Sequence, residues 1–379
     1  MPRVVIWRSA MLSGSETFVR NHGAALSRWQ PAYLGATRVP SVLAERTDVI
    51  AFPETTAGRR AFLRLRLTGS SPRLTGLLAG LRPDLVHAHF GGDGWLVSRA
   101  AADLRVPLVV TVHGHDVTRQ PETAGARGAR YRRNLRTVFD RATVVLAVSA
   151  HIRDRAVALG ADPDKVLVHH TGVPMTPLLD RPKKWDVIFV GRFVEKKGVD
   201  DLIDALAALP APGPRALFIG TGPLEAAMRA RAAGHGLAAT FLGAQAPDQV
   251  TRHLAESRLL AAPARTAADG DSEGLPTTIL EAAAQGLPTV STRHSGIPEA
   301  VLHGETGLLG AEGDSTATAH HIQKLLGNPS LRDRLGRQAR AHVEAHFDLH
   351  RQSRLLEDLY DAVSAGAPAG RPGAQPWRR

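Results

Sequence analysis

The stretch Glu273-Gly274-Leu275-Pro276-Thr277-Thr278-Ile279-Leu280-Glu281 places two carboxylates around a predicted helix start. Proline is tolerated in a first helical turn, so Pro276 and Thr277 mark where the helix begins. Glu281 then lies about one and a half turns into the helix, and Glu273 lies in the preceding loop. Backbone amides at such a helix start favour an anionic group such as phosphate. The two carboxylates can then accept hydrogen bonds from hydroxyl groups of a ligand that carries such an anion.

Short apolar runs alternate with amphipathic stretches on both sides of this motif, and we interpret these runs as buried parallel strands. In the second half they cover residues 187–190, 216–219, 240–242, 259–262 and 289–291. In the first half they cover residues 4–7, 85–89, 108–112 and 144–148. Alternating strands and helices predict an α/β fold with parallel sheets. Two such series predict two doubly wound domains, whose ligands lie beyond the carboxyl ends of the strands.

The boundary between the domains is predicted within residues 174–185, which contain Pro174, Pro177, Pro182 and a basic pair, because proline breaks regular elements. The first domain then covers residues 1–177 and the second covers residues 183–347. A last helix is predicted over residues 348–364. The tail, residues 365–379, is rich in Gly, Pro and Ala, and we predict that it is disordered.

The composition is that of a globular protein, with 43% hydrophobic and 22% charged residues among 379. The absence of cysteine excludes disulfides, thiolate nucleophiles and cysteine-ligated metal sites. No apolar run approaches the ~18 residues of a membrane-spanning helix, and no signal peptide is visible. We therefore predict a cytoplasmic protein and leave open a peripheral position at the inner membrane face.

The net charge of +11 is concentrated in the first half, where residues 1–180 hold 24 Lys and Arg against 14 Asp and Glu. One arginine cluster lies within residues 59–73, and a second lies within residues 127–136. A basic face indicates an anionic partner, such as phosphate, nucleic acid or acidic lipid, or a solvated arginine-rich surface. Residues 59–73 also contain leucines. This stretch is interpreted either as a contact with an anionic membrane or as an amphipathic helix packed on the first domain.

The motif at residues 273–281 resembles the E-x7-E signature of the GT4 family of retaining glycosyltransferases. Residues 190–198, 286–288, 296–301 and 303–309 are also similar to that family. Residues 15–18, 87–91 and 111–116 resemble its exopolysaccharide, colanic-acid-type subgroup. The resemblance implies a GT-B fold: two facing Rossmann-like domains with a cleft between them, and a terminal helix that crosses back to the first domain. The first domain would bind the acceptor and the second the nucleotide-sugar donor.

On the donor side, the resemblance implies that Arg192 and Lys197 neutralise the leaving diphosphate. Lys196 is an alternative to Lys197, although the spacing to Gly198 favours Lys197. The catalytic residues implied are His113, Glu273, Arg192 and Lys197. The remaining donor contacts implied are Gly14, Gly222, Gly243, Ala244, Gly274, Leu275, Pro276, Thr277 and Glu281.

On the acceptor side, the implied contacts are Ser15, Glu16, His115 and Asp116, while His113 would touch the transferred sugar. Many family members carry two adjacent glycines after the first strand, whereas this chain has only Gly14 between two serines. That departure leaves the detail of the acceptor side open. Glu16 can equally stabilise a helix N-terminus, and an isolated histidine is often structural.

No metal and no cofactor are expected, apart from the nucleotide sugar as co-substrate. Residues 269–271, Asp-Gly-Asp, resemble the Asp-x-Asp metal motif of another glycosyltransferase fold. They directly precede Glu273, however, and family members generally use basic residues and helix amides instead. The pairs His169-His170 and His320-His321 lack the spacing and companion ligands of a zinc site.

The predicted function is transfer of a sugar, with retention, from a nucleotide diphosphate sugar to a hydroxyl of a glycan, a lipid-linked glycan or a natural product. UDP is favoured over GDP and ADP by family frequency. The alternatives are a GT-B-fold sugar-nucleotide epimerase, a phosphorylase and a non-catalytic protein that binds a nucleotide sugar or another anionic ligand. No nucleic-acid module is recognisable. The donor sugar, the acceptor, the linkage and the oligomeric state are left open.

Overall fold

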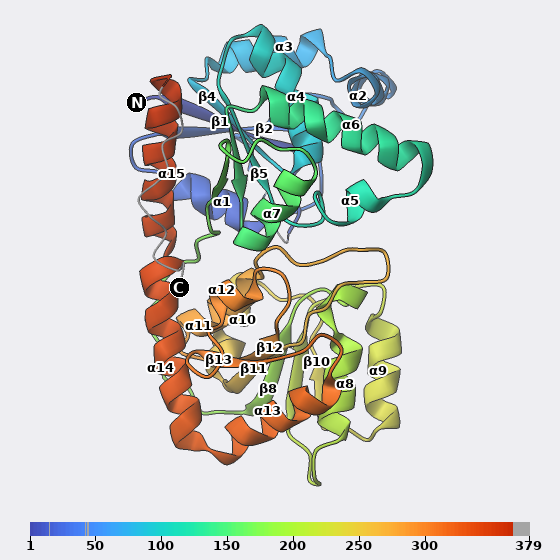
Figure 1. Cartoon of the computed structure of the whole chain (residues 1–379), viewed down its shortest axis with the longest axis vertical. Coiled ribbons are helices and arrows are strands. Elements are labelled where there is room, and N and C mark those ends of the chain that lie inside the picture. Colours follow the sequence, from blue (N-terminus) through green and yellow to red (C-terminus); the bar gives the residue numbers. More distant parts are fainter. Residues whose placement is uncertain (15, 42, 44, 367–379) are drawn as a thin grey trace. The chain divides into compact units, whose positions relative to one another are not determined.

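The computed structural model describes residues 1–14, 16–41, 43 and 45–366, and these form two compact units. The first unit contains Met1–Gly172 together with the chain from Leu349 onward, and the second contains Val173–Asp348. Each unit is a parallel sheet flanked by helices (Figure 1). Between the last strand of the first sheet, which ends at Val168, and the first strand of the second, which begins at Trp185, the chain is irregular. The tail predicted over residues 365–379 lies outside the described residues from 367 on.

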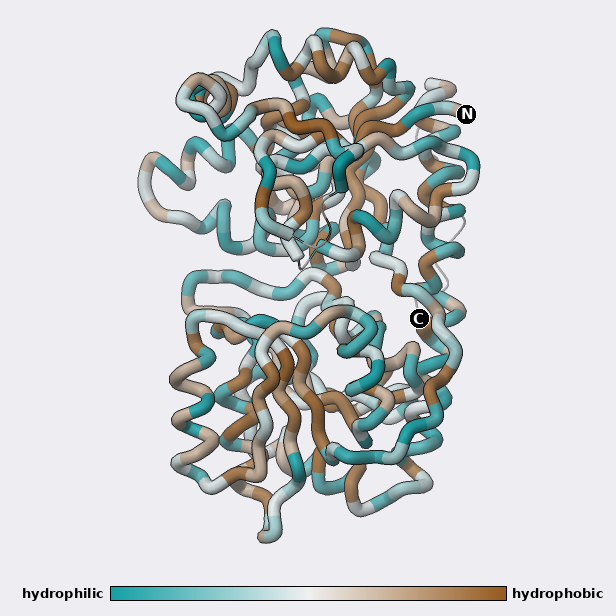
Figure 2. The backbone as a smooth tube through the Cα atoms, turned by 180° about the vertical axis from the view of Figure 1, so that it is seen from behind, coloured by the Kyte–Doolittle hydropathy of each residue, from teal (hydrophilic) through white to brown (hydrophobic). Residues whose placement is uncertain are grey.

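The first sheet has seven parallel strands in the order β3-β2-β1-β4-β5-β6-β7. The strands are β1 (Arg3–Met11), β2 (Gln30–Arg38), β3 (Val49–Ile50), β4 (Leu85–His89), β5 (Leu108–Val112), β6 (Val144–Ala147) and β7 (Val166–Val168). Every residue of β4, β5 and β6 is buried, as expected where helices cover both faces of a parallel sheet. In Figure 2 the strands are mostly hydrophobic, whereas hydrophobic and hydrophilic residues alternate along the helices.

Its helices are α1 (Thr17–Ala24), α2 (Thr56–Thr68), α3 (Pro72–Leu81), α4 (Gly91–Asp103), α5 (Arg119–Glu122), α6 (Gly125–Arg141), α7 (Ala150–Ala158) and α15 (Leu349–Ser364). The arginine-rich residues 59–73 therefore belong to two helices instead of one. Gly69 ends α2 in the left-handed conformation with a φ of 67°, and Ser71 caps α3 by accepting from the Leu74 amide. A glycine followed by a serine cap is a standard helix stop and restart.

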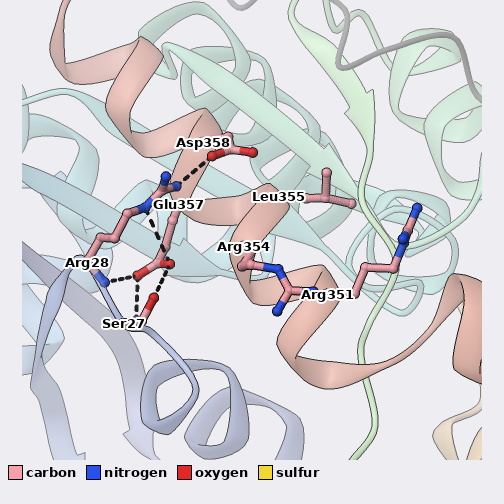
Figure 3. Close-up of a pocket in the computed structure, with 7 residues that line it drawn as sticks. All are labelled: Ser27, Arg28, Arg351, Arg354, Leu355, Glu357 and Asp358. Carbon is pink, nitrogen blue, oxygen red and sulfur yellow. Dashed lines mark hydrogen bonds and ion pairs between the residues drawn. The ribbon is translucent and has the colours of Figure 1, made fainter.

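Helix α15 belongs to the core of the first unit although it comes last in the chain. Its residues Leu356, Tyr360 and Val363 pack among the apolar side chains of the first sheet. The fully buried carboxylate of Glu357 accepts hydrogen bonds from the backbone amides of Ser27, at 2.6 Å, and Arg28, at 2.5 Å (Figure 3). These contacts attach α15 to the loop between α1 and β2.

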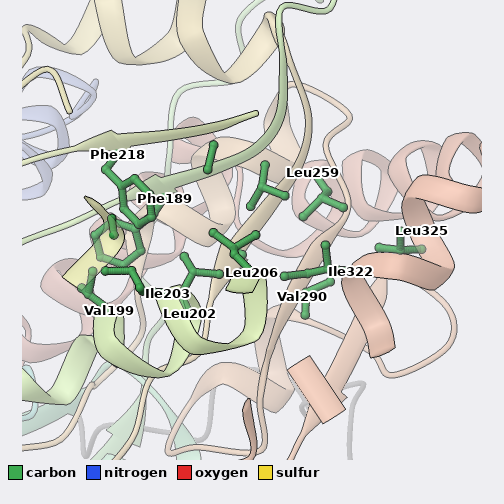
Figure 4. Close-up of a cluster of buried hydrophobic side chains, with 14 of the residues drawn as sticks. Phe189, Val199, Leu202, Ile203, Leu206, Phe218, Leu259, Val290, Ile322 and Leu325 are labelled. Carbon is green, nitrogen blue, oxygen red and sulfur yellow. The ribbon is translucent and has the colours of Figure 1, made fainter. Parts of the chain in front are cut away.

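The second sheet has six parallel strands in the order β10-β9-β8-β11-β12-β13. The strands are β8 (Trp185–Val190), β9 (Ala216–Ile219), β10 (Ala239–Phe241), β11 (Ser257–Ala262), β12 (Thr289–Thr292) and β13 (Gly307–Gly310). The helices are η1 (Glu195–Lys197), α8 (Val199–Ala207), α9 (Glu225–Gly234), α10 (Pro247–Ala255), α11 (Thr277–Ala284), α12 (Ile297–Ala300), α13 (Ser315–Gly327) and α14 (Pro329–His346). Phe189 and Phe218 of the sheet pack with Leu202, Ile203 and Leu206 of α8 (Figure 4).

Both sheets reverse their winding direction once. The chain runs outward from β1 to β3 and then returns to β4 on the other side of β1. It likewise runs outward from β8 to β10 and returns to β11 beside β8. Ligands of doubly wound sheets bind beyond the carboxyl ends of the strands at such switch points. The two positions to inspect are therefore the loops after β1 and β4 and the loops after β8 and β11.

We predict that Glu357→Gln destabilises the protein by about 2 kcal/mol, because hydrogen bonds to a buried carboxylate are stronger than those to a neutral amide. The measurement is chemical denaturation followed by tryptophan fluorescence, since Trp29 packs against Tyr360 of α15 at 5.3 Å between ring centroids. The matched control is Asp358→Asn, an exposed neighbour, which should change stability by less than about 0.5 kcal/mol. Equal effects of the two substitutions would contradict this account of α15.

Candidate active site

A lysine–carboxylate cluster occupies the switch point of the second sheet. Helix η1 follows β8 and carries Lys196 and Lys197, and the loop after β11 carries Glu273. The Nζ atom of Lys197 lies 2.9 Å from Glu273 Oε2, and that of Lys196 lies 3.6 Å from Glu273 Oε1. The structure thus brings together Lys197 and Glu273, two predicted site residues that lie 76 positions apart in the sequence.

The two lysines differ in how many hydrogen bonds their ammonium groups donate within the protein. Lys196 is 8% exposed and also donates to Asp271 Oδ1, at 3.1 Å, and to the Ser272 carbonyl, at 3.2 Å. Among the residues that the structure describes, Lys197 has Glu273 as its one side-chain partner. Lys196 therefore holds the loop after β11 in place, whereas Lys197 keeps donors for a ligand. This difference favours Lys197 over Lys196 as the ligand contact.

Gly198 permits η1 to lie against that loop. Its φ is 59°, in the left-handed region, and a Cβ atom there would come within 1.9 Å of the Pro263 carbonyl oxygen. Any other residue would be strained and would also push the two loops apart. The short distance between Lys197 and Glu273 therefore depends on this glycine.

A second chain of contacts orients the backbone of Glu273. Its amide donates to His294 Nε2 at 3.0 Å, and the Ser295 hydroxyl donates to its carbonyl at 2.5 Å. Because Nε2 of His294 accepts, its Nδ1 carries the proton and donates to Glu312 Oε1, at 2.7 Å. Sequence reasoning missed His294, Ser295 and Glu312. The first two lie three and four residues beyond the predicted strand 289–291, at its carboxyl end, and this position is a signal that could have identified them.

The charge on Glu273 follows from this environment. Burial alone would raise the pKa of the carboxyl, but the charges of Lys197 and Lys196 outweigh it and lower the pKa to about 2. The group is therefore an anion at neutral pH. Its Oε1 atom is buried without a hydrogen-bond partner among the described residues, although Lys196 lies 3.6 Å away. A buried oxygen of this kind is ready to accept from a ligand hydroxyl.

The other predicted donor residues lie at the same carboxyl edge of the second sheet. Arg192 follows β8 and is exposed, Gly222 follows β9, and Gly243 and Ala244 follow β10. A Cβ atom at Gly222 would lie 2.5 Å from the Phe193 carbonyl oxygen, so this turn needs glycine for close packing. Helix α11 begins at Thr277. In its first turn the Ile279 amide donates to the Pro276 carbonyl at 3.1 Å, which leaves the amides of Thr277 and Thr278 without a partner among the described residues. Glu281 lies within α11, where burial raises its pKa to about 7.

At the switch point of the first sheet, Arg8 organises the loops after β1 and β4. It donates to Glu16 at 2.5 Å and to Asp93 at 2.5 Å, and its guanidinium lies 4.4 Å from the centroid of the Phe90 ring. Glu16, predicted as an acceptor contact, is therefore 8% exposed and engaged by Arg8. Gly14 is exposed. Ser15, the other predicted contact here, lies outside the described residues.

His113 follows β5, as the sequence predicted, and lies among other rings. Its Nε2 atom is 3.0 Å from His89 Nδ1, and its ring centroid is 4.5 Å from that of Phe90. Burial and the nearby charge of Arg8 hold the pKa of His113 well below its usual range, so the imidazole is neutral at physiological pH. A neutral imidazole can accept or donate a hydrogen bond to a sugar without carrying charge.

Asp116 uses both carboxylate oxygens on backbone amides. Oδ2 accepts from Gly91 at 2.8 Å, and Oδ1 accepts from His113 and Gly114, each at 3.0 Å. This geometry favours a role in positioning the loop that carries His113 over the acceptor contact that the sequence suggested. His115 lies on the wall of a pocket in the first unit.

Among the described residues, no group of three or more His, Cys, Asp or Glu side chains is arranged to hold a metal ion. The described helices also include none whose length and apolar character would suit a membrane crossing.

The fold is that of the GT-B class, and solved structures share it. The HepE protein of Anabaena in complex with UDP aligns with a TM-score of 0.77 at 20% identity, over 96% of this chain and 100% of that one. Sucrose-phosphate synthase of Thermosynechococcus elongatus aligns with a TM-score of 0.77 at 18% identity, over 97% and 100%. The predicted α/β, GT-B fold is confirmed.

The sequence places the chain more closely within this class. Residues 177–342 match the family described as glycosyl transferases group 1, and residues 12–176 match the one described as glycosyltransferase family 4. The amylovoran biosynthesis glycosyltransferase AmsK of Erwinia amylovora is 30% identical over 74% of this chain and 70% of that protein. The putative colanic acid biosynthesis glycosyltransferase WcaL of Escherichia coli is 31% identical over 74% and 71%. The chain belongs to the same glycosyltransferase family as these relatives, which confirms the family resemblance inferred from the sequence.

The raised pKa of Glu281 predicts a pH dependence of stability. In the unfolded chain this carboxyl titrates near 4.5, and in the folded protein near 7. Between these values the folded state binds the extra proton, so the free energy of unfolding should fall as pH rises from about 4.5 to 7, by at most about 3 kcal/mol. Glu281→Gln should remove this component, and the exposed Glu344→Gln should not. The measurement is the melting temperature of all three proteins across that range. A wild-type profile parallel to that of Glu281→Gln would show that the carboxyl titrates normally.

Proposed function

We propose that the protein is a retaining, metal-independent glycosyltransferase that uses a nucleotide diphosphate sugar, with UDP as the first choice of nucleotide. The observation that carries this proposal is Glu273: a buried anion with one unpartnered oxygen, beside Lys197, at the switch point of the second sheet. A carboxylate beside a lysine suits a nucleotide-sugar donor, because the carboxylate can accept hydrogen bonds from sugar hydroxyls while the lysine binds the adjoining diphosphate. The HepE protein, which has the same fold, was solved in complex with UDP and with UDP-glucose, and this supports the choice of nucleotide.

In this proposal the second unit binds the donor. Lys197 and Arg192 neutralise the diphosphate, and the free amides at the start of α11 add positive potential. The turns after β9 and β10, which contain Gly222, Gly243 and Ala244, lie near the nucleoside. Glu281 accepts hydrogen bonds from the ribose hydroxyls, and Glu273 accepts from the sugar.

The reaction proceeds on one face of the sugar. The bond between the anomeric carbon and the leaving phosphate oxygen breaks while the bond to the acceptor oxygen forms. The proton of the acceptor hydroxyl passes to the departing phosphate, so no separate strong base is required. Lys197 and Arg192 stabilise the charge that grows on the diphosphate, and Glu273 stabilises the cationic character of the sugar. Neutral His113 contacts the transferred sugar by a hydrogen bond.

The first unit receives the acceptor, which we propose is a growing polysaccharide or a lipid-linked form of one. The relatives named for amylovoran and colanic acid biosynthesis support this choice. We also propose a peripheral position on the cytoplasmic face of an anionic membrane. The exposed arginines Arg59 and Arg60 of α2 would contribute to that contact.

The test is to incubate the purified protein with a panel of nucleotide sugars without acceptor, while following nucleotide release and donor-induced thermal stabilisation. We expect one donor to stabilise the protein and to be hydrolysed slowly. Glu273→Gln should reduce that release by at least about 100-fold, because it removes a preorganised charge next to the reacting centre. Glu344→Gln is the matched control, since the same chemical change on exposed α14 should have no effect.

Three results would overturn the proposal. If no donor stabilised the protein near millimolar concentration, the donor site would be wrongly placed. If release continued undiminished in Glu273→Gln, the carboxylate would have no role in the chemistry. If the free nucleotide sugar emerged epimerised, the protein would be an epimerase.

A further inference from the structure

Three histidines of the first unit lie close together at the carboxyl ends of β4 and β5. His87 and His89 alternate along β4, so their side chains share one face of the sheet. Both are 2% exposed, and their rings stack with the centroids 4.5 Å apart. His113, which follows β5, adjoins His89. Imidazoles buried among apolar strands are unfavourable unless their nitrogens are hydrogen-bonded, so each nitrogen of this group needs an account.

His87 has a structural role. Its Nδ1 atom lies 2.5 Å from the Tyr360 hydroxyl, and its Nε2 atom lies 2.7 Å from Thr111 Oγ1. Tyr360 belongs to α15, so these bonds connect that helix to the sheet. Both ring nitrogens are used within the protein, and His87 therefore has nothing left for a ligand.

His89 and His113 share a hydrogen bond between His89 Nδ1 and His113 Nε2, which are 3.0 Å apart. Burial holds the pKa of each imidazole well below its usual range, so both rings are neutral. Of two neutral rings joined in this way, one donates and the other accepts, which ties the tautomer of His113 to that of His89. Nδ1 of His113 has no partner among the described residues and is the ring atom left for a ligand.

The orientation of the His113 ring is restricted by further contacts. Its centroid lies 4.5 Å from that of Phe90 and 4.8 Å from that of Phe18. Its backbone amide donates to Asp116 Oδ1 at 3.0 Å. Separate contacts thus hold the backbone, the ring faces and the Nε2 edge of His113, and they leave its Nδ1 edge uncovered.

The turn after β4 holds both His89 and Phe90 against His113. The φ of Phe90 is 73°, in the left-handed region, which is unusual for a bulky residue. Arg8 lies 4.4 Å from the centroid of the Phe90 ring and donates to the His89 carbonyl at 3.0 Å. The Phe90 amide donates to the Thr111 carbonyl at 2.7 Å. Backbone strain of this kind persists only where the surroundings hold it, and it is concentrated at functional sites.

We infer that His89 is a positioning residue for His113: its hydrogen bond fixes the tautomer and the orientation of the His113 imidazole, so that Nδ1 faces the transferred sugar. His89 acts through His113, because His89 is buried whereas His113 is partly exposed. The inference rests on the proposed function for the contact with a sugar. The coupling between the two rings does not.

The competing explanation is that His89 only packs and stabilises the sheet. In that case its loss would lower stability, and its effect on activity would be independent of His113. If His89 acts through His113, removal of both residues should cost no more than removal of His113 alone, because the two effects are not additive.

The first measurement is nitrogen NMR of the full chain labelled with ¹⁵N-histidine, in wild type, His89→Leu and His89→Asn. The signals of His113 are assigned by their loss in His113→Leu. In the wild type we expect one protonated and one unprotonated ring nitrogen, unchanged between about pH 6 and 8 because the pKa lies well below that range. His89→Leu should give a mixture of both tautomers. His89→Asn should retain one tautomer, because its amide takes the position of Nδ1.

The second measurement is the slow hydrolysis of UDP-glucose, or of the panel donor that stabilises the protein most. His89→Leu should lower kcat by at least about 10-fold and His89→Asn by less than about threefold, because the amide preserves the orientation of His113. In a His113→Leu background, His89→Leu should change kcat by less than about twofold.

The matched control is Tyr360→Phe, which removes a buried hydrogen bond from the same group of histidines without touching His113. It reports what a loss of stability alone does to activity, and its kcat should stay within about twofold of the wild type. Every variant should keep a cooperative melting transition, which verifies that it folds.

Three results would overturn the inference. A single wild-type tautomer of His113 in His89→Leu would show that the bond does not set the ring. Losses that multiply in the double variant would show that His89 acts independently of His113. An equal loss in Tyr360→Phe would assign the effect of His89→Leu to stability.

The outcome is separable from the proposed function, because the NMR samples contain no nucleotide sugar. If the tautomer depends on His89 while the donor panel fails, the coupling of the rings stands and the role toward a sugar is rejected with the transferase. If hydrolysis depends on Glu273 and is unaffected by His89→Leu, the transferase stands and the positioning role is rejected.

Discussion

A buried carboxylate shared by two lysines is the interaction on which the site of this protein depends. The Glu273 carboxylate forms ion pairs with both lysines. These ion pairs connect the loop after β11 to η1, which follows β8, at the switch point of the second sheet. Removal of one partner from such a cluster leaves an uncompensated buried charge, which costs about 3–5 kcal/mol in comparable cases. The position of η1, the path of the loop and the start of α11 are thus coupled through one anion.

The two adjacent lysines of the cluster have different roles: Lys196 is structural, and Lys197 is available to a ligand. Lys196 is buried against Asp271 and Ser272, so it can hold the loop whether or not a ligand is bound. Lys197 contributes one hydrogen bond to Glu273 and can share its remaining donors with a phosphate. A third group, His294, orients the backbone of Glu273 and is itself oriented by Glu312. These contacts fix the position of Glu273 and leave its Oε1 atom without a hydrogen-bond partner among the described residues.

Much of the fold could be predicted from the sequence because its strands are short, apolar and bounded by turns. Helix α15 has the predicted limits to within one residue, since its apolar spacing is regular. Four strands were missed. Gln30, Pro31 and Gly35 interrupt the apolar pattern of β2, whereas β3, β7 and β13 have only two, three and four residues. In each missed strand, pairing with a neighbour overrides weak local propensity.

Of the candidate site, the sequence pointed to Lys197 and Glu273 but not to the groups that position them. Glu312 lies 18 residues from His294, and Arg8 lies 85 residues from Asp93, so only the folded chain reveals these pairs. The pocket in the first unit could not be anticipated either. Arg66 and Arg130, which line it, belong to separate arginine clusters in the sequence, and a hydrogen bond from the Arg130 guanidinium to the Arg66 carbonyl brings them together.

The most direct test of the central claim is the affinity for UDP, measured by calorimetry in wild type, Lys197→Met, Glu273→Gln and the exposed control Lys324→Met. If Lys197 is held by Glu273 for the diphosphate, Lys197→Met should weaken UDP binding by at least about 10-fold, since a charge-assisted hydrogen bond is lost. Glu273→Gln should also weaken UDP binding, because the neutral amide no longer holds Lys197 and the start of α11 in place, whereas Lys324→Met should preserve the affinity. Unchanged UDP affinity in Lys197→Met would contradict the account.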